Sequence, residues 1–175
     1  MKYKAIIKGQ QEPNGKIRVS GAKNAAVKLL SASILSDENV QLDNFPTKIV
    51  DANYQISFLE KIGVDVQKDD VNETLKINPS KLSNKMLDDY YYPIRTTYLL
   101  VSGLIKKSGR AFIPYPGGCN IGNRGYDLHM MVWETLGAKV VEHKDYIEVI
   151  AKDGFIPNQT IDFPISTIGG TENAL

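Results

Sequence analysis

The sequence is poor in the residues from which disulfide frameworks, metal sites and membrane spans are built. Its 175 residues include one cysteine and two histidines, and no apolar run approaches membrane-spanning length. A single cysteine excludes an internal disulfide and suits a reducing compartment. His129 and His143 form no metal-ligand spacing with Cys119, because a metal site needs three or four converging ligands. We predict no metal ion, no cofactor and no membrane span.

A large excess of charge of either sign is also absent. The 21 Lys and Arg are balanced by 20 Asp and Glu, which gives a formal net charge of +1. A nearly neutral chain lacks the global field that nucleic-acid and membrane-surface binders use, so neither partner is expected. Tyr90-Tyr91-Tyr92 has no interleaved basic residues and indicates a packed aromatic cluster, not a platform for stacked bases.

What the chain does have is the composition of a globular domain, with 42% hydrophobic and 23% charged residues. The N-terminal residues lack the long apolar core of a signal peptide, so a cytoplasmic location is expected. Hydrophobic periodicity and turn signals predict alternating helices and strands. The predicted helices span residues 22–35, 49–62, 94–105 and 127–136. The predicted strands span residues 40–42, 64–66, 74–77, 109–114, 139–141 and 146–150.

The chain contains two similar units, each made of a helix, a short strand, a helix and a hairpin. Residues 29–35 match residues 99–105 in pattern, and residues 58–66 match residues 132–140. A third copy begins near Gly170 and stops. A helix of one turn cannot bury a face or propagate stably, so we expect the third unit to be incomplete and the chain to be cut within it.

The first 20 residues carry the signals of a separate hairpin. Residues 3–8 and 16–19 alternate like strands, and Pro13-Asn14-Gly15 between them is a turn signal. The helix predicted after them, over residues 22–35, is apolar on almost its whole surface and is expected to be buried.

The stretch from Tyr115 to His129 holds the only cysteine, four glycines and an arginine. Glycines let backbone N–H groups approach an anion, and Arg124 adds a permanent forked cation. A cysteine beside a cation and a helix start has a stabilised thiolate, so Cys119 is a candidate for reactive chemistry. The alternatives are a buried apolar cysteine and an ordinary glycine turn.

Lys23 and Asn24 stand at the start of the helix predicted over residues 22–35. The helix dipole disfavours a lysine there, whereas a helix N-terminus can bind anions, so Lys23 suggests a phosphate or carboxylate partner. A solvated lysine is the alternative. Arg95, in the first turn of another predicted helix, has a plain surface position as its alternative. Asp127 is placed to cap the helix that follows it.

Several motifs, taken together, point to one family. They are Gly21-Ala22-Lys23-Asn24-Ala25-Ala26, Arg95, Pro116-Gly117-Gly118-Cys119-Asn120-Ile121-Gly122-Asn123-Arg124, Asp127-Leu128-His129 and Gly169-Gly170-Thr171-Glu172-Asn173. This set resembles the UDP-N-acetylglucosamine 1-carboxyvinyltransferase family of enolpyruvyl transferases. The likeness covers essentially the whole chain, and the cysteine loop is its specific part.

The resemblance implies an α/β (α+β) fold, an inside-out α/β barrel of repeated βαβαββ units in two similar domains. Residues 1–20 would supply strands of the second domain. Residues 21–175 would form the first domain, truncated in its third repeat and so with about two of its three units. The active site of the family lies between the domains. The isolated chain is therefore expected to lack a complete site and to need the missing second domain or a partner chain.

The resemblance also implies an enzyme that transfers an enolpyruvyl group from phosphoenolpyruvate to the 3′-hydroxyl of UDP-N-acetylglucosamine and releases phosphate, in peptidoglycan precursor synthesis. Cys119 and Lys23 match catalytic positions, and fosfomycin alkylates the cysteine in the family. Several fixed cations suit a donor that carries a phosphate and a carboxylate. The implied substrate-binding residues are Lys23, Asn24, Arg95, Arg124, Gly125, Tyr126, Asp127, Leu128, Ser166 and Thr167.

Two departures from the family pattern leave the acceptor open. The family commonly has proline where this chain has Gly125, followed by Tyr126, and residues 162–169 contain an apparent two-residue insertion. Enolpyruvyl transferases acting on other uridine nucleotides, such as UMP, share the scaffold; the 3-phosphoshikimate enzyme shares it too but lacks the cysteine loop. A different class also stays open, namely a truncated or split non-catalytic domain that binds a nucleotide or a partner through exposed apolar helices.

Overall fold

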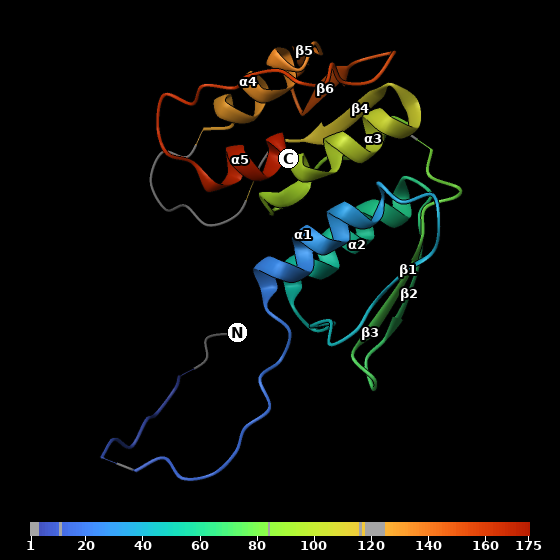
Figure 1. Cartoon of the computed structure of the whole chain (residues 1–175). Helices are drawn as coiled ribbons and strands as arrows, with labels where there is room; N and C mark the ends of the chain where they lie inside the picture. Colours follow the sequence, from blue (N-terminus) through green and yellow to red (C-terminus); the bar gives the residue numbers. More distant parts are fainter. Residues whose placement is uncertain (1–3, 11, 84, 116, 118–124) are drawn as a thin grey trace.

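The computed structural model describes residues 4–10, 12–83, 85–115, 117 and 125–175. Two units follow one another along the chain and lie one above the other in Figure 1. The first contains α1 (Lys23–Ser33), β1 (Val40–Leu42), α2 (Val50–Lys61), β2 (Asp65–Asp69) and β3 (Thr74–Asn78). The second contains the 3₁₀ helix η1 (Thr96–Leu100), α3 (Val101–Ser108), β4 (Arg110–Pro114), α4 (Asp127–Thr135), β5 (Lys139–Glu142) and β6 (Tyr146–Ile150). A last helix, α5 (Ile168–Ala174), follows the second unit.

Each unit forms a three-stranded antiparallel sheet with the same strand order, β1-β3-β2 in the first and β4-β6-β5 in the second. The last strand of each unit is central: Ile77 of β3 pairs with Val40 on one side and Val66 on the other. Left-handed glycines follow α2, α3 and α4, where only a residue without Cβ fits easily. The repeat predicted from the sequence is confirmed.

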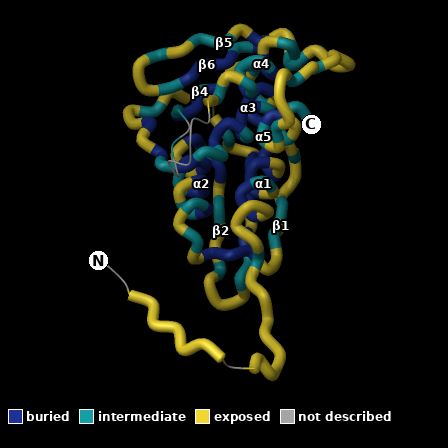
Figure 2. The backbone as a smooth tube through the Cα atoms, turned by 90° about the vertical axis from the view of Figure 1, so that its left-hand side faces the viewer, coloured by how far each residue is buried: buried dark blue, intermediate teal, exposed yellow. Residues whose placement is uncertain are grey.

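The helices lie between the two sheets, and the buried residues are concentrated there (Figures 1 and 2). Leu30 of α1, Phe58 of α2, Leu104 of α3 and Trp133 of α4 are fully buried in one continuous core. No described helix is both long and apolar enough to cross a membrane.

The N-terminal segment differs from the prediction. Residues 4–10 and 12–22 contain no strand, and most of their side chains are exposed along a stretch that leaves the body of the molecule (Figure 2). A two-stranded hairpin is marginal in water unless a core or a third strand covers its apolar face. Nothing in the described part of the chain covers Ile6, Ile7 or Ile17, so the expected hairpin does not form here.

The sequence predicted that the first helix is buried on almost all sides, but α1 is buried on only part of its surface. Leu30 and Ile34 are fully buried, but Leu29 is 52% exposed and Leu35 is 40% exposed. Propensity and composition cannot say which side of an apolar helix is covered, because packing partners decide that. One apolar stripe of α1 therefore faces outward.

Candidate functional site

The start of α1 has the features of an anion site. Lys23 and Asn24 occupy its first turn, and both residues are exposed. The preceding Ala22 provides no side-chain cap, so the first N–H groups of this helix have no side-chain acceptor. A helix start of this kind, with the positive end of the dipole, can bind an anion, and the anion partner expected for Lys23 stays a prediction.

The structure gives Lys23 a partner that sequence reasoning missed. Its Nζ forms an ion pair with the carboxylate of Asp51, on α2. The two side chains remain 48% and 39% exposed, and exposed pairs contribute about 1 kcal/mol or less. A more highly charged anion, such as a phosphate, can therefore take the place of Asp51 at low cost.

Arg95 lies directly before η1 and reaches across to the chain after the cysteine loop. Its Nη2 donates to the carbonyl oxygen of Gly125 at 3.4 Å. On the other side of the loop, the N–H of Gly117 donates to the carbonyl of Ile94 at 2.9 Å. The residues that enter and leave the loop are thus both held at the start of η1.

His129 is the most perturbed group in this region. Its ring is 5% exposed and stacks on Tyr98 with ring centroids 3.6 Å apart. Burial, followed by the positive charge of Arg95, lowers the pKa of His129 to about 4, against a smaller opposing effect of Asp127. The imidazole is therefore neutral at physiological pH. Within the described part of the chain its Nδ1 has no hydrogen-bond partner.

Asp127 does not cap α4, which corrects the sequence prediction. It is the first helical residue, and Tyr126 occupies the cap position without a side-chain bond. A carboxylate in the first turn still interacts favourably with the helix dipole. A Cβ at Gly125 would come within 2.1 Å of Asp127 Oδ1, so any other residue at 125 would displace this carboxylate. Leu128 is half-buried.

Thr167 has a structural task at the start of α5. Its Oγ1 accepts a hydrogen bond from the N–H of Gly170 at 3.1 Å, which caps the helix. The preceding Ser166 is exposed. A Cβ at Gly169 would lie 3.2 Å from His129 Cε1, so the start of α5 packs against the start of α4. In Figure 1 α1 and α5 begin on the same, left-hand side of the molecule.

Cys119 and Arg124 lie outside the described residues. The predicted meeting of Lys23, Arg95 and Arg124 around the thiol therefore stays a prediction. Among the residues that the structure does describe, His, Cys, Asp and Glu side chains nowhere gather in the groups of three that could hold a metal ion.

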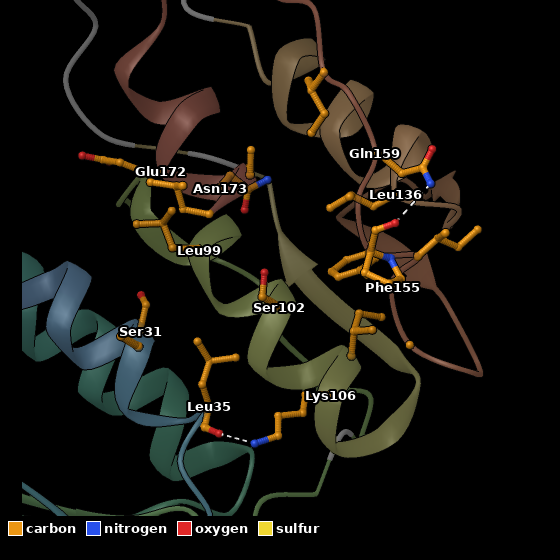
Figure 3. A pocket seen from close by; sticks show the side chains of 18 of the residues that line it. Ser31, Leu35, Leu99, Ser102, Lys106, Leu136, Phe155, Gln159, Glu172 and Asn173 are labelled. Atoms are coloured by element: carbon orange, nitrogen blue, oxygen red, sulfur yellow. Dashed lines mark hydrogen bonds between the residues drawn. The ribbon is translucent and has the colours of Figure 1, made fainter.

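A groove of about 870 Å³ is lined by none of the predicted site residues (Figure 3). Leu35, two residues after α1, lines it together with Leu99 of η1 and Phe155 of the segment after β6. Its few charged groups are occupied: Lys106 donates to the carbonyl of Leu35 at 2.6 Å. Because its lining is mainly apolar, this groove suits a hydrophobic surface and not a phosphate.

Comparison with known proteins identifies the family. A family model of EPSP synthase (3-phosphoshikimate 1-carboxyvinyltransferase) matches residues 7–175. The chain belongs to the EPSP synthase family. Its relatives include the UDP-N-acetylglucosamine 1-carboxyvinyltransferases of Caulobacter vibrioides, 38% identical, and Novosphingobium aromaticivorans, 34% identical, each over 98% of this chain. These matches cover 40% and 42% of the relatives, so the chain spans about two fifths of their length.

Two solved structures of enolpyruvyl transferases share the fold of this chain. An EPSP synthase from Acinetobacter baumannii superposes with a TM-score of 0.70 at 15% identity, over 92% of this chain and 37% of that one. The enolpyruvyl transferase NikO from Streptomyces tendae gives a TM-score of 0.66 at 19% identity, over 82% of this chain and 31% of that one. At such identities the likeness concerns the fold alone. The predicted α/β fold class is confirmed, as part of a domain.

Three features of this EPSP synthase-family chain had no signal in its sequence. They are the pairing of Lys23 with Asp51, the burial of His129 against Tyr98, and the hydroxyl of Tyr126 bound to Glu142. Each joins residues on different elements, and periodicity along the chain carries no information about such pairs.

Proposed function

We propose that the chain forms part of an enzyme that transfers the enolpyruvyl group of phosphoenolpyruvate to the 3′-hydroxyl of UDP-N-acetylglucosamine and releases phosphate, for peptidoglycan precursor synthesis. The observation that carries this proposal is the 33–38% identity to UDP-N-acetylglucosamine 1-carboxyvinyltransferases along almost the whole chain. Both substrates are phosphorylated metabolites of the cytoplasm, and we place the protein there.

The chemistry sets what the site must supply. The 3′-oxygen of the sugar adds to C2 of phosphoenolpyruvate and loses its proton, while C3 gains one. The tetrahedral intermediate then loses a proton from C3 and phosphate from C2, which restores the double bond. Protonation of C3 needs a positioned acid, and the phosphate and carboxylate need fixed cations. We assign the acid chemistry to Cys119 and the cations to Lys23, Arg95 and Arg124.

The local structure supports this assignment for the described residues. The start of α1 is uncapped, and Lys23 is held by an exposed carboxylate that a phosphate can replace. We assign Asn24 to the donor and acceptor together. The uridine nucleotide is assigned to residues 124–128 and to Ser166 and Thr167, whose segments approach each other where Gly169 meets His129.

Further polypeptide is required for the complete site. The chain spans about two fifths of the length of its relatives, and the apolar groove beside α1 and α5 is open. We propose that the polypeptide equivalent to the remaining length of the relatives, in the same chain or a partner chain, covers this groove and supplies the second domain.

Two measurements test the function. Mass spectrometry after fosfomycin treatment should show one adduct on Cys119, and Cys119→Ser should show none. With the remaining polypeptide present, phosphate release from phosphoenolpyruvate should depend on UDP-N-acetylglucosamine. Turnover with UMP or shikimate 3-phosphate alone would reassign the acceptor.

A second candidate is a non-catalytic nucleotide- or partner-binding domain, favoured by the open apolar groove. It predicts binding of the uridine nucleotide or of the remaining polypeptide without any phosphate release. An unmodified thiol under conditions that label an intact relative would support this candidate against the enzyme.

A further inference from the structure

Two tyrosines flank the segment that carries Cys119, and both reach the same place. The hydroxyl of Tyr126 donates to Glu142 Oε2 at 2.9 Å. The hydroxyl of Tyr115 donates to the carbonyl of His143 at 2.8 Å and lies 3.4 Å from the same Glu142 oxygen. The two rings also pack together, with centroids 5.3 Å apart. The chain before residue 116 and the chain after residue 124 are therefore fastened to one point at the end of β5.

That point belongs to the β5–β6 hairpin. Glu142 pairs with Ile147 at the end of the β5–β6 ladder. The N–H of His143 donates to the carbonyl of Tyr146 at 2.9 Å, which closes the turn between the strands. The ring of His143 stacks on Tyr146, and its Nε2 lies 2.8 Å from Glu148 Oε2. The acceptors for both tyrosines therefore lie on a turn that has hydrogen bonds and ring contacts of its own.

A second pair of contacts holds the same two ends at the start of η1. Gly117 bonds to the carbonyl of Ile94, and Arg95 bonds to the carbonyl of Gly125. A Cβ on Gly117 would lie 2.9 Å from Pro93 Cα, so the backbones approach too closely for another residue. Each end of the segment is thus held at two independent points.

The tyrosine hydroxyls remain donors at neutral pH. Burial and the negative charge of Glu142 raise the pKa of Tyr115 to about 12. The hydrogen bond to Glu142 is the main cause that raises the pKa of Tyr126. Neither hydroxyl ionises under physiological conditions, so the contacts persist across the working range of the protein.

We propose that Glu142 is a positioning residue that holds the two ends of the Cys119 segment at a fixed separation through Tyr115 and Tyr126. These contacts fix the points at which the chain enters and leaves the segment that carries Cys119. This inference rests on the proposed function, because it concerns how the cysteine assigned to catalysis is placed. We call the three residues the tyrosine clasp.

The experiment measures the thiol and needs no turnover. Cys119 is the only cysteine, so its rate of alkylation by iodoacetamide is specific to this segment. The rate would be compared for the 175-residue chain and its Tyr126→Phe, Glu142→Ala and Glu142→Gln variants. Loss of one such hydrogen bond corresponds to about a two- to tenfold change in an equilibrium. We expect a change of that size for Tyr126→Phe and Glu142→Ala, and a smaller one for Glu142→Gln, which keeps an acceptor.

Trypsin cleavage after Arg124 gives a second readout, because no other Lys or Arg lies between residues 116 and 124. Cleavage there should accelerate in the same variants. The double variant of Tyr126→Phe and Glu142→Ala should change no more than Glu142→Ala alone, because Glu142→Ala already removes the bond that Tyr126→Phe removes. A bond with a merely structural role would alter thermal stability and leave these local rates unchanged.

Tyr91→Phe and Glu134→Gln are the matched controls, since both residues are exposed and lie outside the clasp. Alkylation and cleavage rates equal to those of the controls would overturn the proposal. A changed thiol rate in a protein that forms no enolpyruvyl product would leave the clasp intact and remove only the proposed function.

Discussion

At the residue scale, His129 shows how a buried imidazole links stability to pH. The ring lies between Tyr98 and the start of α5, and burial with the nearby Arg95 keeps it neutral. In the unfolded chain the same imidazole titrates near its ordinary pKa of 6.5. Between pH 6.5 and about 4 the unfolded chain therefore binds a proton that the folded chain does not.

The stability that depends on neutral His129 is present above pH 6.5 and is lost as the pH falls toward 4. Each pH unit in this window corresponds to about 1.4 kcal/mol, so wild type should lose about 2 kcal/mol more between pH 6.5 and pH 5 than His129→Phe. Denaturant unfolding at the two pH values checks this. Equal losses in both proteins would contradict the assigned pKa.

The ion pair of Lys23 with Asp51 should matter little for stability. Both side chains are substantially exposed, so Asp51→Asn should change the free energy of unfolding by less than about 1 kcal/mol. Glu172→Gln, which breaks the pair of Lys28 with Glu172, is a matched control between helices. A loss above about 2 kcal/mol for Asp51→Asn alone would show that Lys23 is fixed structurally and is not available to a phosphate.

At the scale of elements, one buried side chain joins three helices. Gln55 of α2 is fully buried, and its Nε2 donates to the carbonyl of Val27 at 3.0 Å and to Ser31 Oγ at 2.6 Å, both on α1. Its Oε1 accepts from Thr96 Oγ1 of η1 at 2.6 Å. This amide connects the first unit to the start of the second, close to Arg95.

Gln55→Leu keeps much of the volume but removes the hydrogen bonds of the amide to Val27, Ser31 and Thr96. Each such bond contributes about 0.5–1.5 kcal/mol, so we expect a loss of about 2–4 kcal/mol in the free energy of unfolding. Gln67→Leu, at an exposed position on β2, should change it by less than about 0.5 kcal/mol. Urea denaturation of both variants provides the comparison, and similar small effects would show that Gln55 does not join the helices.

At the scale of the whole molecule, a substitution in the open groove can be tested for its effect on folding separately from its effect on assembly. Leu29 is 52% exposed on the outward stripe of α1 and lines the groove. A charge placed there is solvated in the chain alone, whereas under a covering apolar surface it would be desolvated. The same substitution therefore distinguishes the two states.

Leu29→Glu should change the stability of the isolated chain by less than about 0.5 kcal/mol, as is usual for surface positions. It should weaken association with the remaining polypeptide at least tenfold, by analytical ultracentrifugation or by reconstituted phosphate release. Val71→Glu, at a 90% exposed position outside the groove, serves as the control. Unchanged association for Leu29→Glu would exclude the groove as the covered surface.

The sequence by itself determined the repeat, the succession of helices and strands after residue 20, and the family. Hydrophobic periods and turn residues act over a few neighbouring positions, so they can be recognised without knowing what packs against them.

Only the tertiary structure decided which residues meet. One apolar stripe of α1 is exposed, and residues 4–10 and 12–22 form no strands. Tyr126, and not Asp127, is the residue before α4. Tyr115 and Tyr126 both contact Glu142. These outcomes depend on surfaces contributed by elements far apart in the chain. Which side chains contact each other depends on how the whole fold packs, and local sequence patterns do not contain that information.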